Sequence, residues 1–174
     1  MVFDKFEMTI DLKPFERELS EPMRKNRETY ADKVLDEVED VFTRLVRFYA
    51  PKDTGDYAAS WDTVARDENS VTIGTNRTML FSVLEFGVDH PWTIEAEDAE
   101  SLSWVDSSGT RRFAKSVTHP PQKAQPHLRK AFADFEKIYR HIMLAVLGEL
   151  VPAFRKSTRD DRRKVDDLLA KTKQ

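Results

Sequence analysis

Four carboxylate side chains follow Trp92 at short spacing, and they are the first place where this sequence could hold chemistry. They are Glu95, Glu97, Asp98 and Glu100. Carboxylate oxygens bind divalent cations, so one interpretation is a metal site of the kind that a small metal-dependent nucleic-acid-processing enzyme would use. An exposed loop rich in acidic residues is the commoner origin of such a cluster, and we favour that interpretation.

The other catalytic or ligand-binding patterns that we considered are each incomplete in this sequence. The letters Asp53-Thr54-Gly55 occur in aspartic-protease loops, but those loops follow a hydrophobic run and need a second carboxylate facing the first. Here Ala50-Pro51-Lys52 precedes them. Ser60 and Ser82 lack the glycine-framed turn of a nucleophile. No two histidines have the i, i+4 spacing of a helical zinc site, and no glycine-rich phosphate loop is present. We therefore expect no catalysis and no cofactor. The histidines are His90, His119, His127 and His141.

The composition indicates one folded domain with a core of its own. The chain has 174 residues, of which 40% are hydrophobic and 34% charged, with a net charge of −3 and no cysteine. A chain of this size buries about 70% of its unfolded surface. The slightly acidic balance argues against a general nucleic-acid binder, because phosphate binding needs a basic surface. No disulfide, thiol nucleophile or cysteine-bound zinc is possible. Charged residues near the start and the lack of a long apolar run predict neither a signal peptide nor a membrane span.

Two long helices are predicted to frame the domain. Apolar residues recur at helical spacing from about Pro22 to Tyr49, and the Ala50-Pro51 pair should end that helix, because the residue before proline leaves helical geometry. Asp53-Thr54-Gly55 then predicts a tight turn. A second helix is expected from about His127 to Leu150.

Between the helices the pattern predicts a small, mostly antiparallel sheet. Strands are expected at 57–66 and 70–74, joined by a turn at 67–69. Residues 79–86 could form a short helix or a strand. Residues 102–105 and 112–117 flank a turn at 106–110 and predict a hairpin. The expected fold is α+β, with a hairpin excursion from the sheet and both helices packed on one sheet face.

The two ends are expected to differ from the central domain, which we place at residues 21–152. Residues 1–20 alternate weakly, and we favour an arm that docks on a neighbour over a strand of the domain's own sheet. Residues 153–174 are predicted to form a charged tail, with eight basic and four acidic residues from position 155 onwards. Such a tail is usually solvated. The alternative is a segment that binds a partner, with a possible apolar stripe at Val165, Leu168 and Leu169.

Three short motifs occur in order across these elements. The first is Ala50-Pro51-Lys52-Asp53-Thr54-Gly55 leading into Tyr57-Ala58-Ala59-Ser60-Trp61; the second is Phe81-Ser82-Val83-Leu84-Glu85-Phe86-Gly87; the third is Gln125-Pro126-His127-Leu128-Arg129-Lys130-Ala131-Phe132. Together, over about residues 30–150, they resemble a family of neck and tail-completion proteins of long-tailed phages, the gene-product-ten-like tail components. That family has an "AP-x-DTG-x-L-x-x-S" turn, a "YA-x-x-VEFGT" segment and a "P-F-L-R-P-A" entry to the last helix.

The chain departs from the family pattern at several places. Tyr57 stands where leucine is usual, Phe81-Ser82 replaces Tyr-Ala, and Val88 replaces the threonine after "EFG". His127 and Lys130 replace a phenylalanine and a proline. Residues 92–119 form a long insertion, although longer members of the family have a hairpin there.

The resemblance implies a structural virion protein of the head–tail junction that completes the tail or joins it to the head. It would be made in the host cytoplasm and act as a subunit of a closed ring, with six copies as the family's expectation. Its partners would be neighbouring neck proteins and the tail tube, and DNA would pass through the ring without specific contact. A tail-terminator ring is the alternative within this class, and the metal-dependent enzyme is the alternative outside it.

The motifs also suggest roles for particular residues. Glu85 matches the family's glutamate, and a hydrogen bond or ion pair of its carboxylate would fix the turn at Gly87, with Arg129 as the expected partner. Trp104 and Phe113, on opposite arms of the hairpin, are the expected interaction surface. The structural motif residues are Pro51, Asp53, Thr54, Gly55, Ser60, Glu85, Phe86, Gly87, Pro126, Leu128 and Arg129.

Overall fold

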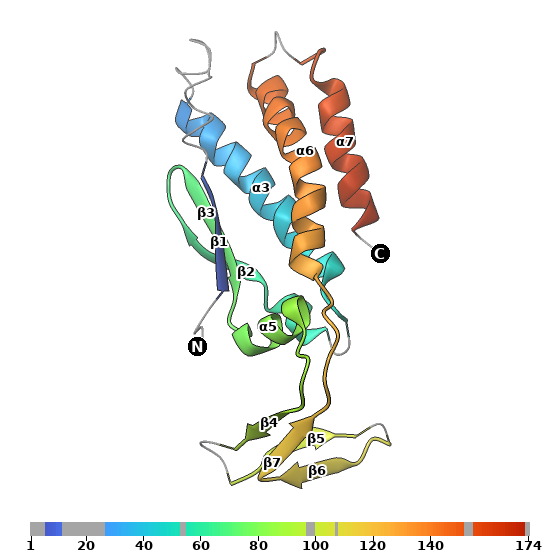
Figure 1. Ribbon diagram of the computed structural model, residues 1–174. Helices are drawn as coiled ribbons and strands as arrows, with labels where there is room; N and C mark the ends of the chain where they lie inside the picture. Colours follow the sequence, from blue (N-terminus) through green and yellow to red (C-terminus); the bar gives the residue numbers. More distant parts are fainter. Residues whose placement is uncertain are drawn as a thin grey trace. The chain divides into compact units, whose positions relative to one another are not determined.

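A computed structural model describes residues 6–11, 27–52, 55–96, 100–106, 108–151 and 155–172. The chain divides into two compact units. Unit 1 contains the residues up to Phe81 and those from Pro126 onwards, and unit 2 is Ser82–Gln125 (Figure 1). Long helices and small antiparallel sheets make an α+β protein, so the predicted fold class is confirmed.

Helix α3 (Arg27–Tyr49) is the first long helix. One face of it is completely buried, because apolar residues recur every three or four positions along it. The helix ends before the Ala50-Pro51 pair, as expected. Its predicted first turn, residues 22–26, lies outside the described residues. The buried stripe consists of Val34, Leu35, Val38, Val41, Phe42, Leu45 and Val46.

Helix α6 (His127–Leu150) has the predicted bounds and packs along α3 (Figure 1). The Phe42 ring meets the edges of Phe132 and Phe135 at centroid distances of 5.7 and 5.3 Å. The Tyr30 hydroxyl donates to the carbonyl of Met143 at 2.9 Å. Aromatic pairs in this edge-to-face geometry add to the stability gained by burial alone. The contact between the two helices therefore forms the centre of unit 1.

A three-stranded antiparallel sheet completes unit 1, in the order β1-β3-β2. The strands are β1 (Phe6–Asp11), β2 (Asp62–Arg66) and β3 (Ser70–Thr75). The central strand β3 packs against α3 and buries Val71 and Ile73. The Asp67 carboxylate accepts the backbone N–H groups of Asn69 and Ser70, both at 2.8 Å, which closes the predicted turn between β2 and β3.

Two sequence expectations about this sheet are wrong. The strand expected from Tyr57 begins only at Asp62, because Asp56–Ala59 form a short helix, α4. Residues 1–20 were expected to include an arm for a neighbour, but Phe6–Asp11 pair with β3 over the full length of β1. The alternative, a strand of the domain's own sheet, is correct for those residues.

The C-terminal segment is also different from the solvated tail that its charge suggests. Arg159–Lys171 form helix α7, which packs along α6 (Figure 1). Val165 is fully buried there, so the apolar stripe that offered the alternative prediction has a structural role. His141 Nδ1 of α6 meets Asp161 Oδ1 at 2.6 Å, and Arg162 forms ion pairs with Glu37 of α3 and Glu149 of α6.

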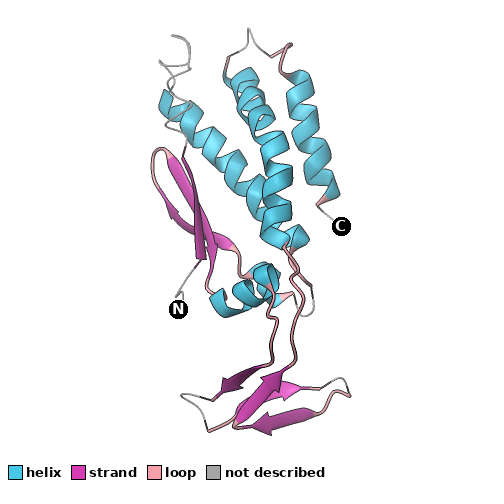
Figure 2. Ribbon diagram, viewed as in Figure 1, coloured by secondary structure: helices cyan, strands magenta, loops and turns pink. Residues whose placement is uncertain are grey.

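Helix α5 (Thr78–Phe86) leads from unit 1 into unit 2 and settles the open choice between helix and strand for this segment. Beyond it, unit 2 is built of strands (Figure 2). β4 (Trp92–Glu95) pairs with β7 (Ser116–His119), and β5 (Leu102–Val105) pairs with β6 (Arg111–Ala114). The predicted hairpin is confirmed, but its second arm is divided at Lys115 into β6 and β7. None of the described helices is long and apolar enough to span a membrane.

Candidate functional site

The three motifs each supply a side chain to one buried cluster in unit 1. Tyr57 and Trp61 come from the first motif, Phe81 from the second and His127 from the third. The Phe81 ring lies 6.0 Å from the rings of both Trp61 and His127, and Trp61 and His127 are also 6.0 Å apart. A hydrogen bond of 2.7 Å joins the Tyr57 hydroxyl to His127 Nε2. The three motifs, which are separate in the sequence, thus come together at one place in the fold.

Local structure explains how the first motif reaches this cluster. Gly55 has φ +84°, a left-handed conformation that glycine adopts without strain, and the chain turns there into α4. The Ser60 hydroxyl then donates to the Tyr57 carbonyl and meets Thr75 Oγ1, both at 2.7 Å. Pro51 follows the end of α3, whereas the motif residues Asp53 and Thr54 lie outside the described residues.

The Tyr57–His127 pair can position elements but cannot act on a substrate. His127 is only 1% exposed, so no solute reaches its ring. From the sequence, His127 was expected to begin the second helix and was given no part in a site. The sequence did contain a signal for this contact. Tyr57 and His127 both differ from the residues that are usual in the phage family that the motifs resemble. The structure shows that these two side chains bond to each other. The two side chains therefore satisfy each other's polar groups in a buried position.

Other motif residues have simpler positions. Pro126 directly precedes α6, where its fixed φ of −68° suits a helix entry. Leu128 is half-buried, and Phe86 and Arg129 are exposed. Glu85 is 2% exposed, and burying a carboxylate is costly unless it is hydrogen-bonded or paired. Glu85 and Arg129 belong to different units, so the bond between them stays a prediction.

Two passes of the chain approach each other closely at Gly87 in unit 2. Gly87 has φ +75°, and its N–H donates to the Val83 carbonyl at 2.9 Å. Val88 and Gln122 exchange backbone hydrogen bonds, both 2.8 Å long. A Cβ atom at position 87 would lie 2.7 Å from the backbone nitrogen of Ala124 and 2.8 Å from the carbonyl oxygen of Gln122. Only glycine fits this crossing.

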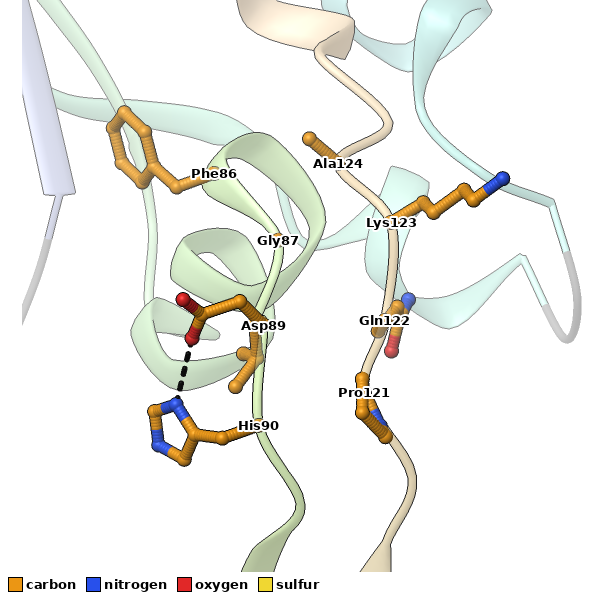
Figure 3. A pocket seen from close by; sticks show the side chains of 9 residues that line it. Phe86, Gly87, Asp89, His90, Pro121, Gln122, Lys123 and Ala124 are labelled. Atoms are coloured by element: carbon orange, nitrogen blue, oxygen red, sulfur yellow. Dashed lines mark hydrogen bonds and ion pairs between the residues drawn. The ribbon is translucent and has the colours of Figure 1, made fainter.

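An open groove of about 700 Å³ lies at the same crossing, lined by residues 86–90 and 121–124 (Figure 3). In it the exposed Asp89 and His90 side chains are joined at 2.7 Å between Oδ1 and Nδ1. The hydrogen bond from His90 lowers the pKa of the Asp89 carboxyl. Two exposed side chains beside an open groove do not exclude water, so we assign no catalytic role to them.

The hairpin carries the residues that the sequence proposed as an interaction surface. Trp104 is 40% and Phe113 is 63% exposed. However, Trp104 lies opposite Arg112 and Phe113 opposite Ser103, and directly opposed residues share a face of a sheet. Trp104 and Phe113 therefore point to opposite faces and do not form one aromatic surface. Val105, which is 61% exposed, shares the face of Phe113.

The hairpin turn is organised by the Asp106 carboxylate. It accepts the N–H groups of Ser108 and Thr110 at 2.9 and 3.0 Å, the Ser108 hydroxyl, and Arg112 Nε at 2.8 Å. Gly109 has φ +81°. Hydrogen bonds to the ionised form, first from the Ser108 hydroxyl and then from Arg112, lower the pKa of Asp106 to about 2.

This shift predicts how the turn responds to acid. Because the pKa of Asp106 in the folded protein is below its ordinary value of 3.8, its stabilising effect is complete above that value and is lost as the pH falls towards 2. An NMR titration of the Asp106 carboxyl should give the lowered pKa. Ser108→Ala should move it towards the ordinary value, while Asp106→Asn should make the turn amides insensitive over this range. An ordinary pKa in the wild type would contradict the prediction.

The acidic cluster that the sequence offered as a metal site lies only partly in the described structure. Glu95 and Glu100 are exposed, while Glu97 and Asp98 lie outside the described residues. Across the described ranges, no group of three or more acidic or histidine side chains is arranged to hold a metal ion.

Comparisons of the chain with protein-family models, with curated proteins and with solved structures found no match.

Proposed function

We propose that this protein is a structural subunit of the head–tail junction of a long-tailed phage, which completes the tail or joins it to the head as part of a ring. One observation carries the proposal. Three motifs that resemble those of neck and tail-completion proteins occur in the order of that family, and Tyr57, Trp61, Phe81 and His127 from these motifs meet in one buried cluster. Their common packing gives the three motifs a shared structural role in this chain.

The proposed role is mechanical. Unit 1 supplies a core of packed helices and a sheet, and unit 2 supplies a ribbon of strands with exposed Val105 and Phe113 on one face and Trp104 on the other. Val105 and Phe113 share one face, and a contiguous exposed apolar patch is a candidate surface for a partner. A ring requires that two different surfaces of one subunit meet in successive copies. Six copies is the expectation that the family carries, with neighbouring neck proteins and the tail tube as further partners.

A tail-terminator ring is the alternative within the same class, because such a ring would need the same kind of subunit. The alternative from another class is a metal-dependent enzyme acting on nucleic acid, which would use Glu95 and its acidic neighbours. The joining and terminator roles predict different particles, and the enzyme predicts a nuclease activity, so particle images together with a nuclease assay separate all three.

The test is a nonsense mutation in this gene in the parent phage, with particles examined by cryo-electron microscopy. The proposal expects filled heads and tails of normal length that fail to join, with infectivity restored by the wild-type protein. Tails of abnormal length would instead indicate a terminator. Normal infectious particles that lack the protein would overturn the virion role. Nuclease activity of the purified protein that is lost in Glu95→Gln/Glu100→Gln would support the enzyme.

A further inference from the structure

The strands of unit 2 form a ribbon with two arms. The first arm, residues 92–106, contains β4 and β5, and the second arm, residues 107–125, contains β6 and β7. The two arms carry opposite charge. The segment from Trp92 to Asp106 contains acidic residues and no lysine or arginine, whereas the segment from Ser107 to Gln125 contains basic residues and no aspartate or glutamate. The acidic residues are Glu95, Glu97, Asp98, Glu100 and Asp106; the basic residues are Arg111, Arg112, Lys115 and Lys123. Soluble surfaces ordinarily intersperse the two signs, so this segregation calls for a physical reason.

Ion pairs between the two arms do not neutralise all of these charges. Asp106 and Arg112 form an ion pair beside the turn. Glu95 and Glu100 on the first arm, and Arg111 and Lys115 on the second, are all exposed and form no ion pair with any residue in the described ranges. Each arm therefore presents two exposed charges of one sign that no described residue pairs.

The backbone of each arm is also incompletely paired. Within the described structure β4 pairs only with β7 and β5 only with β6, so every strand of the ribbon has one edge without a neighbour. Unpaired strand edges readily bind a further strand. A two-stranded ribbon is by itself only marginally stable in water and gains stability from added strands.

From these observations we propose that the ribbon is the self-association surface of this protein. The acidic arm (β4 and β5) of one copy lies beside the basic arm (β6 and β7) of the next copy, edge to edge. Successive arms run in opposite directions, so the ribbons join into one antiparallel sheet that continues from copy to copy. This inference rests on the proposed ring function and identifies the contact that builds the ring.

Charge selects this arrangement over the alternatives. A two-fold dimer through like arms would place acid beside acid or base beside base, which electrostatics disfavours. Contact between unlike arms is head-to-tail, and such a contact builds a ring when the rotation between successive copies closes and an open filament when it does not. Because the charges are exposed, the attraction should weaken as salt shortens the screening length to about 8 Å at physiological ionic strength.

The test reverses the charge of each arm separately and leaves the Asp106–Arg112 pair intact. The first variant is Glu95→Lys/Glu97→Lys/Asp98→Lys/Glu100→Lys, and the second is Arg111→Glu/Lys115→Glu/Lys123→Glu. Each arm-reversed variant presents two arms of the same sign, so each should self-associate about tenfold more weakly than wild type at low salt in sedimentation velocity. An equimolar mixture of the two should assemble again, since each arm then finds an opposite partner.

The variant with all seven reversals is the matched control for folding and for specificity. It has unlike arms again, so it should assemble alone, but it should not assemble with wild type. Melting of each variant by circular dichroism shows that it is folded. Wild-type assembly in both arm-reversed variants would overturn the proposal and leave a ring built on another surface. A wild type that stays monomeric at every concentration would overturn it too, while the particle experiment would still decide the proposed function.

Discussion

Gly87→Ala should destabilise the protein by about 3 kcal/mol or more, which is one of the two largest effects that we expect from a single substitution. Two costs add at this position. A residue with a Cβ atom at φ +75° carries about 1–2 kcal/mol of backbone strain. The added Cβ would also lie 2.7 and 2.8 Å from backbone atoms of Ala124 and Gln122, and forcing atoms into a packed site costs about 1–3 kcal/mol.

Gly109→Ala is the matched control for this effect. Gly109 also has a positive φ, +81°, but no atom lies within 4 Å of the position that its Cβ would take. It should therefore show the strain alone, about 1–2 kcal/mol. Urea unfolding of both variants measures the difference. Equal losses would show that the close approach of the chain at Gly87 does not restrict the side chain.

Trp61→Ala should lower the free energy of unfolding by about 3–5 kcal/mol, because it removes the largest fully buried side chain of the motif cluster. Its ring meets the edges of Tyr57, Phe81 and His127 at centroid distances of 6.0–6.4 Å. A cavity there leaves three aromatic rings, which come from three separate parts of the chain, without their common neighbour.

The same substitution at Trp104 separates burial from residue type. Trp104 is 40% exposed, so Trp104→Ala should change the free energy of unfolding by less than about 1 kcal/mol. Chemical denaturation followed by far-ultraviolet circular dichroism compares the two variants without relying on tryptophan fluorescence. Similar losses at both positions would mean that the cluster around Trp61 is not a core of unit 1.

Local patterns were enough to predict the long helices. The second helix was predicted from His127 to Leu150, and both limits hold, because a proline precedes the helix and its apolar residues repeat for its full length. Helix α4 was missed, since four residues cannot display a helical period, and Asp56–Ala59 were absorbed into the neighbouring strand. The positive φ of Gly55 was correctly expected, since it is a property of one residue, whereas Asp53 and Thr54 of the predicted turn lie outside the described residues.

Local sequence patterns could not predict contacts between distant segments of the chain. β1 pairs with β3 from more than sixty residues away, as in the bond between the Thr9 and Thr72 hydroxyls at 2.8 Å. The segment that forms helix α7 was predicted to be a solvated tail because charged residues dominate its composition. In the structure, however, Arg162 forms an ion pair with Glu37 and Val165 is buried. In the candidate site the exposure of Trp104 and Phe113 was anticipated, but their opposite faces follow from a pairing register that the sequence alone did not define.

The division of unit 1 into two stretches of chain has a consequence for its synthesis. The apolar stripe of α3 is covered mainly by α6, which leaves the ribosome only after the whole of unit 2 has been made. At about 5–20 residues per second, the roughly 100 residues between Tyr49 and Leu150 take about 5–20 seconds to translate. During that interval the nascent chain carries a long uncovered hydrophobic face. Chains interrupted before α6 should therefore aggregate or be held by chaperones, whereas complete chains bury the stripe soon after release.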